Sequence, residues 1–212
     1  MEQISPNTTE QNIKEIASFL FGRRDIFSAV DEITADNVLD EVNSALVYHL
    51  QNVMEEEYLY WYRRGLQPIL NRKKDRNSFI LNKVVENHAE EIVTFKNGYF
   101  LMEPAFYISR SGGKSRKVDK LNEYLYRSGK QDADNKLADW FHTVGKAALY
   151  VEPFDDPDIP VRTYALDPRS AFVVYSMKPG NKPLFGVNMV INSEEVSIDV
   201  FTKENIFRLS GH

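Results

Sequence analysis

Apolar residues recur every three or four positions through the first 145 residues, and this spacing predicts a mainly helical N-terminal half. A short helix should be capped by Thr9 and end before Gly22. Its apolar face comprises Ile13, Ile16, Ala17 and Leu20. A long helix should begin at Thr34, which is an N-cap residue type, and end at Gly65. Its apolar stripe comprises Val38, Val42, Ala45, His49 and Val53.

Further helices are predicted after a polar connector that contains Pro68 and residues 71–77. The first should end at Gly98, and its apolar stripe comprises Leu81, Val84, Val85, His88, Ile92 and Phe95. The next two should end at Gly129 and Gly145. Their apolar residues are Val118, Leu121 and Leu125 in one, and Leu137, Trp140, Phe141 and Val144 in the other. Between Gly98 and these two helices, short extended runs are predicted at 99–102 and 105–109.

After Gly145 the apolar pattern changes from helical spacing to short runs typical of β-strands. These runs cover residues 147–151, 162–166, 171–175, 184–191, 196–201 and 206–209. The spacers are turn sequences such as Asp155-Asp156-Pro157 and Lys178-Pro179-Gly180-Asn181. Because the connections between successive strands are short, the sequence predicts an antiparallel meander.

Together these elements predict an α+β fold, with a helical N-terminal half followed by an antiparallel β-meander. We divide the chain into a helical arm at 1–33, a mainly helical region at 34–145 with short strands near 99–109, and an antiparallel β region at 146–212. The last predicted strand lies at the end of the sequence without an element to cover its edge. We therefore expect the protein to continue beyond residue 212.

Composition narrows the classes of function. The 212 residues are 42% hydrophobic and 27% charged, as in an ordinary folded domain. The chain has no cysteine, which excludes disulfides, thiolate metal sites and a cysteine nucleophile. A net charge of −5 argues against tight, sequence-specific DNA binding but allows DNA to pass loosely. No apolar run approaches the roughly 20 residues of a membrane span, so we expect no membrane partner.

Two polar sequences could bind phosphate or metal, and each has a simpler interpretation. Gly113-Lys114-Ser115 matches the end of a phosphate-binding loop, but Ile108 stands where that pattern needs a glycine. We therefore favour a surface loop. Asp155, Asp156 and Asp158 could bind a divalent cation, but the rest of a calcium loop is missing. A stiff, solvated loop is the preferred interpretation.

The histidines do not have the spacing of zinc ligands on one helical turn. His49 and His88 fall on predicted apolar stripes, and His142 lies beside Trp140 and Phe141. We therefore expect these three side chains to occupy packing positions. The sequence predicts no catalytic residue, no cofactor and no metal site.

The end of the long predicted helix holds more aromatic residues than one core face needs. Tyrosine and tryptophan are enriched in the cores of protein interfaces. We therefore predict that Tyr58, Trp61 and Tyr62 form a subunit interface.

Two basic clusters could contact DNA or a partner, although solvated connectors have the same composition. The residues singled out are Arg72, Lys73, Lys74 and Arg76 in the first cluster, and Arg116 and Lys117 in the second.

A series of short motifs in chain order resembles the portal protein family of long-tailed bacteriophages. Residues 62–65 and 68–73 are similar to a "Y-x-x-G…I-x-x-R" opening, and residues 82–104 to an "N-x-h-h-x-N … I-V … G-Y-h-h-G-x-P" block. Glu103 or its neighbour departs from this block, because the family often has a second glycine before the proline. The matching motif positions are Gly65, Arg72, Asn82, Asn87, Gly98, Tyr99, Pro104, Gly145, Asp167 and Pro168.

The resemblance implies a non-enzymatic structural subunit of a closed ring of about a dozen copies, with two different complementary faces on each copy. It also implies a place at the portal vertex of the virion, and in the bacterial host cytoplasm during assembly. Terminase, scaffold, major capsid protein and head–tail adaptor would be partners, and double-stranded DNA would pass non-specifically. The chain would form the outer, wing-like part, with stem, clip and crown beyond it.

Two other hypotheses remain open from the residues alone. One is a non-enzymatic scaffold or adaptor that binds other virion or host proteins through residues 58–62. The other is a nucleotide-dependent enzyme that uses the loop at Lys114. A stable monomer that captures a host protein would favour the first, and nucleotide-induced thermal stabilisation lost in Lys114→Ala would favour the second.

Overall fold

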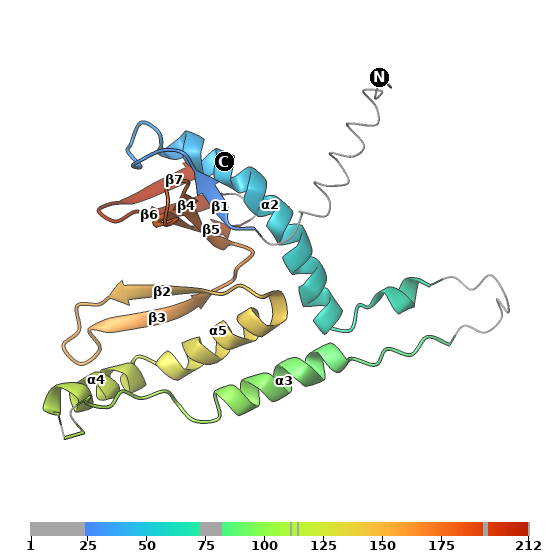
Figure 1. The fold of residues 1–212 in the computed structure, drawn as a ribbon, viewed down its shortest axis with the longest axis horizontal. Helices are drawn as coiled ribbons and strands as arrows, with labels where there is room; N and C mark the ends of the chain where they lie inside the picture. Colours follow the sequence, from blue (N-terminus) through green and yellow to red (C-terminus); the bar gives the residue numbers. More distant parts are fainter. Residues whose placement is uncertain (1–23, 73–81, 111, 114, 193–194, 212) are drawn as a thin grey trace, which may run out of the picture.

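The computed structural model describes residues 24–72, 82–110, 112–113, 115–192 and 195–211, and it has an α+β fold as predicted (Figure 1). The helices of this part are α2 (Val38–Arg63), the 3-10 helix η1 (Pro68–Asn71), α3 (His88–Phe100), α4 (Arg116–Arg127) and α5 (Lys130–Val144). The strands are β1 (Ile26–Ser28), β2 (Ala148–Pro153), β3 (Val161–Leu166), β4 (Ala171–Ser176), β5 (Pro183–Ile191), β6 (Val196–Phe201) and β7 (Ile206–Gly211). The predicted helix capped by Thr9 lies outside the described residues.

The strands form two sheets. The larger sheet has the order β1-β4-β5-β6-β7, and β4 to β7 pair antiparallel in succession, which confirms the predicted meander for the last four of its six strands. The hairpin β2–β3 forms a separate antiparallel pair, with Ala148 opposite Leu166. β1 pairs parallel with β4, with Ile26 opposite Val174. Residues 26–28, which we assigned to the helical arm at 1–33, are therefore a strand at the edge of the larger sheet.

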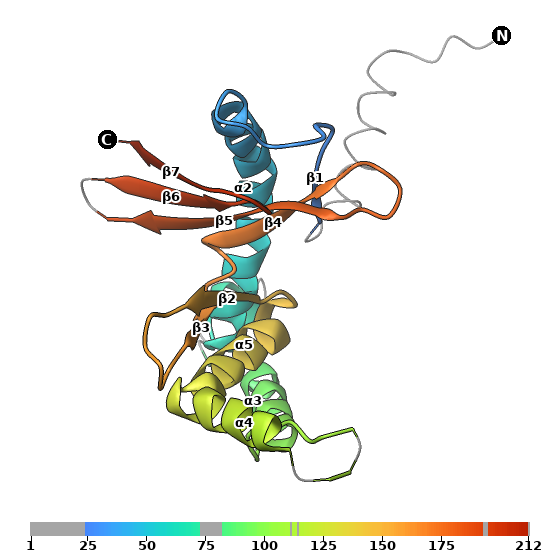
Figure 2. The same ribbon diagram turned by 90° about the vertical axis from the view of Figure 1, so that its left-hand side faces the viewer.

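The main core lies between α2 and the larger sheet. Figure 2 shows α2 running across the strands, with the sheet seen nearly edge-on. Val42 of α2 and Val174 and Val200 of the sheet are at most 1% exposed. Burying each such side chain contributes about 1.5–3 kcal/mol relative to leaving it in water. The predicted stripe of α2 is confirmed for Val38, Val42, Ala45 and His49, which are all buried.

A second layer lies beyond the end of α2. Figure 1 shows α5 between the β2–β3 hairpin and α3, with α4 at the end of this layer. Ala133, Ala138 and Val144 are the buried residues of α5, and Val93 is the buried residue of α3. Tyr150 of β2 packs on Phe201 of β6 with ring centroids 5.1 Å apart. This ring contact joins the hairpin to the larger sheet.

The predicted helix ends at Gly65, Gly129 and Gly145 are confirmed. Their φ angles are +91°, +69° and +77°, in the left-handed region that glycine adopts without strain. The predicted start at Thr34 is wrong, because α2 begins at Val38 after Asn37. Thr34 instead offers its backbone carbonyl to the amide of Val38 at 3.0 Å.

The region around α3 differs most from the prediction. α3 begins at His88, so Val84 and Val85 precede it, and it continues through Gly98 to Phe100. Residues 101–109 contain no strand, and the expected extended runs at 99–102 and 105–109 are therefore wrong. The side chain of Asn87 caps the helix by accepting a hydrogen bond from the Glu90 amide, which fixes the start. Gly98 is tolerated inside a helix at a cost of about 1 kcal/mol relative to alanine.

Candidate functional site

A turn between β3 and β4 places Arg169 at the meeting point of α2 and α5. Its guanidinium donates to Asp167 Oδ2 at 2.6 Å and to Glu57 Oε2 at 2.7 Å. The guanidinium carbon also lies 4.6 Å from the ring centroid of Tyr60 and 5.1 Å from that of Trp140. We call these five residues the Arg169 junction, and it ties the larger sheet to both helices.

The turn itself is stabilised by Asp167. Its carboxylate accepts from the Arg169 amide at 2.9 Å, and its carbonyl accepts from the amides of Ser170 and Ala171 at 3.0 Å each. Pro168 is buried. The hydrogen bonds to Asp167 and to Glu57 raise the pKa of Arg169 above its ordinary value. In turn, the hydrogen bond from Arg169 lowers the pKa of Glu57. Both groups therefore stay charged near neutral pH.

His49 lies beside this junction and is 2% exposed. Its Nε2 is 3.0 Å from the carbonyl oxygen of Arg169, and its ring stacks on Phe172 at a centroid distance of 4.2 Å. Burial lowers the pKa of His49, so the neutral ring donates its Nε2 proton to the carbonyl. The prediction of a packing position for His49 is confirmed.

A second junction centres on Arg63 at the end of α2. Its guanidinium contacts Glu90 of α3 at 2.7 Å and Asp139 of α5 at 2.8 Å. Its Nη1 also donates to Thr143 Oγ1 at 2.6 Å. Burial opposes the charge, but the two carboxylates outweigh it and raise the pKa of Arg63. We call these four residues the Arg63 junction, and Arg63 joins α2 to α3 and α5 there.

The other two predicted histidine positions give different results. His142 is half-buried, and its Nδ1 lies 2.6 Å from Asn97 Oδ1, so its predicted packing position is confirmed. The side chain of His88 is 68% exposed, between Glu86 and Glu91, so its predicted place on an apolar stripe is wrong. The reason is the cap at Asn87, which makes His88 the first residue of α3.

The motif positions divide into a structural group and an exposed group. Asn87 donates to the Arg63 carbonyl at 2.6 Å, and a Cβ on Gly65 would lie 3.9 Å from its amide nitrogen. Asp167 and Pro168 belong to the turn that holds Arg169. Gly145 ends α5. The exposed positions are Arg72, Asn82, Gly98, Tyr99 and Pro104.

The aromatic end of α2 faces two different sides. Tyr60 packs inside, with its ring stacked on Trp140 at 5.6 Å. Tyr58 and Trp61 are 54% and 44% exposed, and Tyr62 is half-buried with its ring 6.1 Å from that of Tyr58. Tyr58 and Trp61 therefore have the exposure that the predicted subunit interface needs.

The basic candidates lie apart from these junctions. Arg72 follows η1 and is exposed, and Arg116 and Lys117 are exposed in the first turn of α4. The predicted contacts Lys73, Lys74 and Arg76 lie outside the described residues. Arg116, Lys117 and Arg72 keep their charge accessible to a partner or to DNA.

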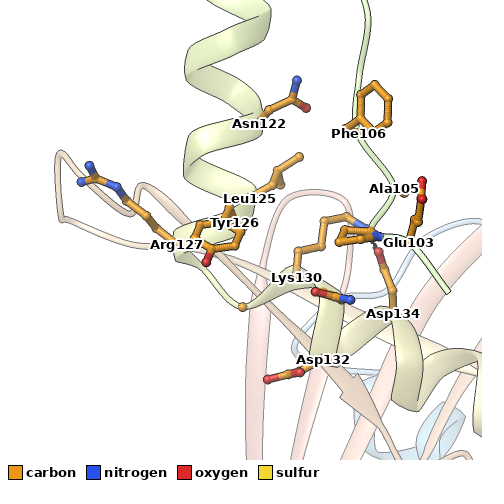
Figure 3. A pocket seen from close by; sticks show the side chains of 13 residues that line it. Glu103, Ala105, Phe106, Asn122, Leu125, Tyr126, Arg127, Lys130, Asp132 and Asp134 are labelled. Carbon is orange, nitrogen blue, oxygen red and sulfur yellow. Dashed lines mark hydrogen bonds and ion pairs between the residues drawn. The ribbon is translucent and has the colours of Figure 1, made fainter. Parts of the chain in front are cut away.

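An open hollow of about 720 Å³ lies between residues 103–106 and the ends of α4 and α5. Figure 3 shows Asn122 and Leu125 of α4 pointing toward the segment that carries Phe106. The amide side chain of Asn122 binds both backbone groups of Tyr107 at 2.8 Å and fixes this segment. Lys130 in the wall is paired with Asp134, so its charge is already neutralised.

The polar sequences singled out above take part in local structure. Ser115 precedes α4, and its backbone carbonyl accepts from the amides of Val118 and Asp119. Asp156 accepts from the Asp158 amide at 2.9 Å, and Asp158 pairs with Arg127 at 3.4 Å. Among the described residues, no three metal-binding side chains gather, and no helix is long and apolar enough to span a bilayer. Lys114 lies outside the described residues.

The residues of the Arg169 junction were not predicted as a unit. The contact between Glu57 and Arg169 spans 112 positions in the sequence, so no local pattern reveals it. The usable signal was the Asp-Pro-Arg turn after a strand, together with an acidic residue among the aromatic residues of the long helix.

Comparison with known proteins identifies the family. The sequence model of the family "Phage portal protein, SPP1 Gp6-like" matches residues 47–211, from the middle of α2 to the end of β7. Comparison with curated proteins gives no match. Portal proteins are non-enzymatic structural proteins of the virion. Because the match covers most of the chain and includes both junctions, the chain belongs to the SPP1 Gp6-like family of phage portal proteins.

Proposed function

We propose that this chain is a structural subunit of the phage portal ring, through which double-stranded DNA enters and leaves the capsid. The family match over residues 47–211 is the observation that carries this proposal. The subunit acts through shape and contact surfaces. Its partners are further copies of itself, terminase, scaffold, major capsid protein and the head–tail adaptor. It is located in the virion, and in the host cytoplasm during assembly.

The two arginine-centred junctions support this role. A ring subunit must hold its contact faces at fixed angles, because cyclic symmetry closes only at one rotation per subunit. The Arg63 and Arg169 junctions tie α2 to α3, α5 and the larger sheet through ion pairs of 2.6–2.8 Å. Such a rigid body suits a subunit whose function depends on geometry.

The charge distribution supports weak contact with DNA. The chain carries a net charge of −5, and strong phosphate neutralisation is what makes DNA binding tight. Arg72, Arg116 and Lys117 are exposed, so they offer isolated positive charges. A ring through which DNA slides needs contacts of this strength.

Native mass spectrometry and electron microscopy of the purified chain test the proposal. We expect closed particles of about a dozen copies. Replacing Tyr58 by alanine should reduce assembly with only a small fall in the melting temperature, because Tyr58 is 54% exposed. Tyr60→Ala is the matched control, since it removes the ring stacked on Trp140 and should lower the melting temperature. A chain that stays monomeric at every concentration would contradict the proposal.

A further inference from the structure

α2 carries a second apolar face in addition to the one buried against the sheet. We call it the α2 stripe, and its members are Val47, Leu50, Met54, Tyr58 and Trp61. They are between 44% and 75% exposed. At 3.6 residues per turn, the five side chains fall within about 80° of one another and point about 160° away from the buried face. The stripe therefore faces away from the larger sheet.

α3 carries an exposed apolar face of the same kind. We call it the α3 stripe, and it consists of Ile92, Phe95 and Tyr99, which are 58%, 71% and 82% exposed. Val93 and Asn97 face α5, so the stripe lies about 150° from the packed side of its own helix. The rings of Phe95 and Tyr99 stack at a centroid distance of 6.2 Å, which gives the stripe a defined shape.

The two stripes have the spacing of helix–helix seams. The α2 stripe advances by three, four, four and three residues, and the α3 stripe by three and four. Apolar residues at steps of three and four form the seam of two helices that pack along their length. Neither seam is covered by another part of the described chain. Contiguous exposed apolar patches larger than a few hundred Å² mark contact sites on folded proteins.

We infer that the α2 stripe of one copy packs against the α3 stripe of the next copy. The inference rests on the proposed ring, because a head-to-tail contact needs two different faces on each subunit. The two seams satisfy that need, since they have matching spacing and lie on different helices. Figure 1 shows that α2 and α3 are at an angle to each other, with α3 beginning near the end of α2.

The apolar composition of the two stripes fits this occupant. A stable interface covers about 800 Å² of each partner, with an apolar core and a polar rim. Eight exposed apolar side chains, five on α2 and three on α3, would form the core of such a contact. A contact between two α2 stripes would use only one of the seams and would stop at a dimer.

Single acidic substitutions test the pairing in the full chain. Met54→Asp places a charge in the middle of the α2 stripe, and Tyr99→Asp places one in the α3 stripe. Tyr126→Asp is the control, because Tyr126 is also 82% exposed and also lies in the last turn of its helix. All three positions are exposed, so each variant should keep the circular dichroism and the melting temperature of the native chain.

We expect Met54→Asp and Tyr99→Asp each to abolish assembly and Tyr126→Asp to leave it intact. Mixing the first two variants should give a dimer that holds one copy of each, because one undamaged α2 stripe and one undamaged α3 stripe remain. Native mass spectrometry separates these species by mass.

Three results would overturn the pairing. If Met54→Asp and Tyr99→Asp each still form closed oligomers, the pairing of the stripes is excluded and the proposed function is not affected. Loss of assembly in only one of the two variants would show that the stripes do not meet each other. If the native chain and the mixture are both monomeric, the pairing and the proposed ring fail together. A variant that loses its fold is replaced by Leu50→Asp or Phe95→Asp, to which the same outcomes apply.

Discussion

Replacing Arg169 by methionine tests whether the turn between β3 and β4 holds the two layers together. Methionine keeps most of the length and apolar volume of the side chain, but it removes the charge and all the hydrogen bonds. Asp167 and Glu57 then lose their shared cation, and Tyr60 and Trp140 lose the group that lies 4.6 Å and 5.1 Å from their ring centroids.

The magnitude follows from the exposure of the partners. Breaking a fully buried pair costs about 3–5 kcal/mol, whereas an exposed pair contributes about 0–1 kcal/mol. The side chains of Arg169, Asp167 and Glu57 are 26%, 33% and 43% exposed, which places these pairs between the two limits. Adding about 0.5–1 kcal/mol for the ring contacts gives a loss of about 2–3 kcal/mol in the free energy of unfolding. For a chain of this length, the melting temperature should fall by about 5–10 °C.

Differential scanning calorimetry and urea unfolding at neutral pH measure this loss. Arg169→Lys should fall between the native chain and Arg169→Met, because lysine keeps the charge and loses the bidentate geometry. Arg208→Met is the matched control: Arg208 also binds one carboxylate at 2.8 Å, but its side chain is 75% exposed. If Arg169→Met has the same melting temperature as the native chain, the junction does not stabilise the fold and the reasoning is refuted.

Two further substitutions test the neighbouring contacts. Asn87→Ala should lower the free energy of unfolding by about 1–2 kcal/mol, since it removes the α3 cap and the 2.6 Å bond to the Arg63 carbonyl; Asn87→Asp keeps the cap acceptor and should recover part of this loss in urea unfolding. Burial holds the pKa of His49 below its ordinary value of 6.5, so the unfolded chain binds a proton more readily and stability should fall as pH drops below about 6.5. His49→Gln should flatten the loss measured between pH 7 and about pH 5.5, and an unchanged slope would exclude His49 as its source.

The strands of the C-terminal half were predictable because turn residues interrupt them at close intervals. All six expected strands start within one residue of the observed position, and β6 spans Val196–Phe201 as predicted. β1 was not predictable, because three residues are too few for an alternating pattern and its partner β4 lies far away in the sequence. The start of α3 was missed for a different reason, since the cap at Asn87 overrides an apolar spacing that begins earlier.

Surplus aromatic residues were a better guide to the surface than to the core. The density of rings at the end of α2 predicted a second contact face, and the structure leaves Tyr58 and Trp61 exposed. The sequence could not separate Tyr60 from its neighbours, because its place depends on Trp140 and Arg169 from distant segments. Likewise, the ion pairs of Arg63 were not predictable, because its carboxylate partners lie 27 and 76 positions further along the chain.

Both arginine junctions use charge where an apolar contact would also hold the layers together. An apolar seam tolerates sliding, whereas a guanidinium that binds two carboxylates from different segments accepts only a narrow range of positions. Arg63 fixes the end of α2 against α3 and α5. Arg169 holds α2 at Glu57, near the same end, against the sheet. The angle between the α2 stripe and the α3 stripe is therefore set by ion pairs at the point where the two helices meet. Loosening either junction should broaden the distribution of oligomer sizes before it unfolds the subunit, because ring closure depends on that angle more steeply than stability does.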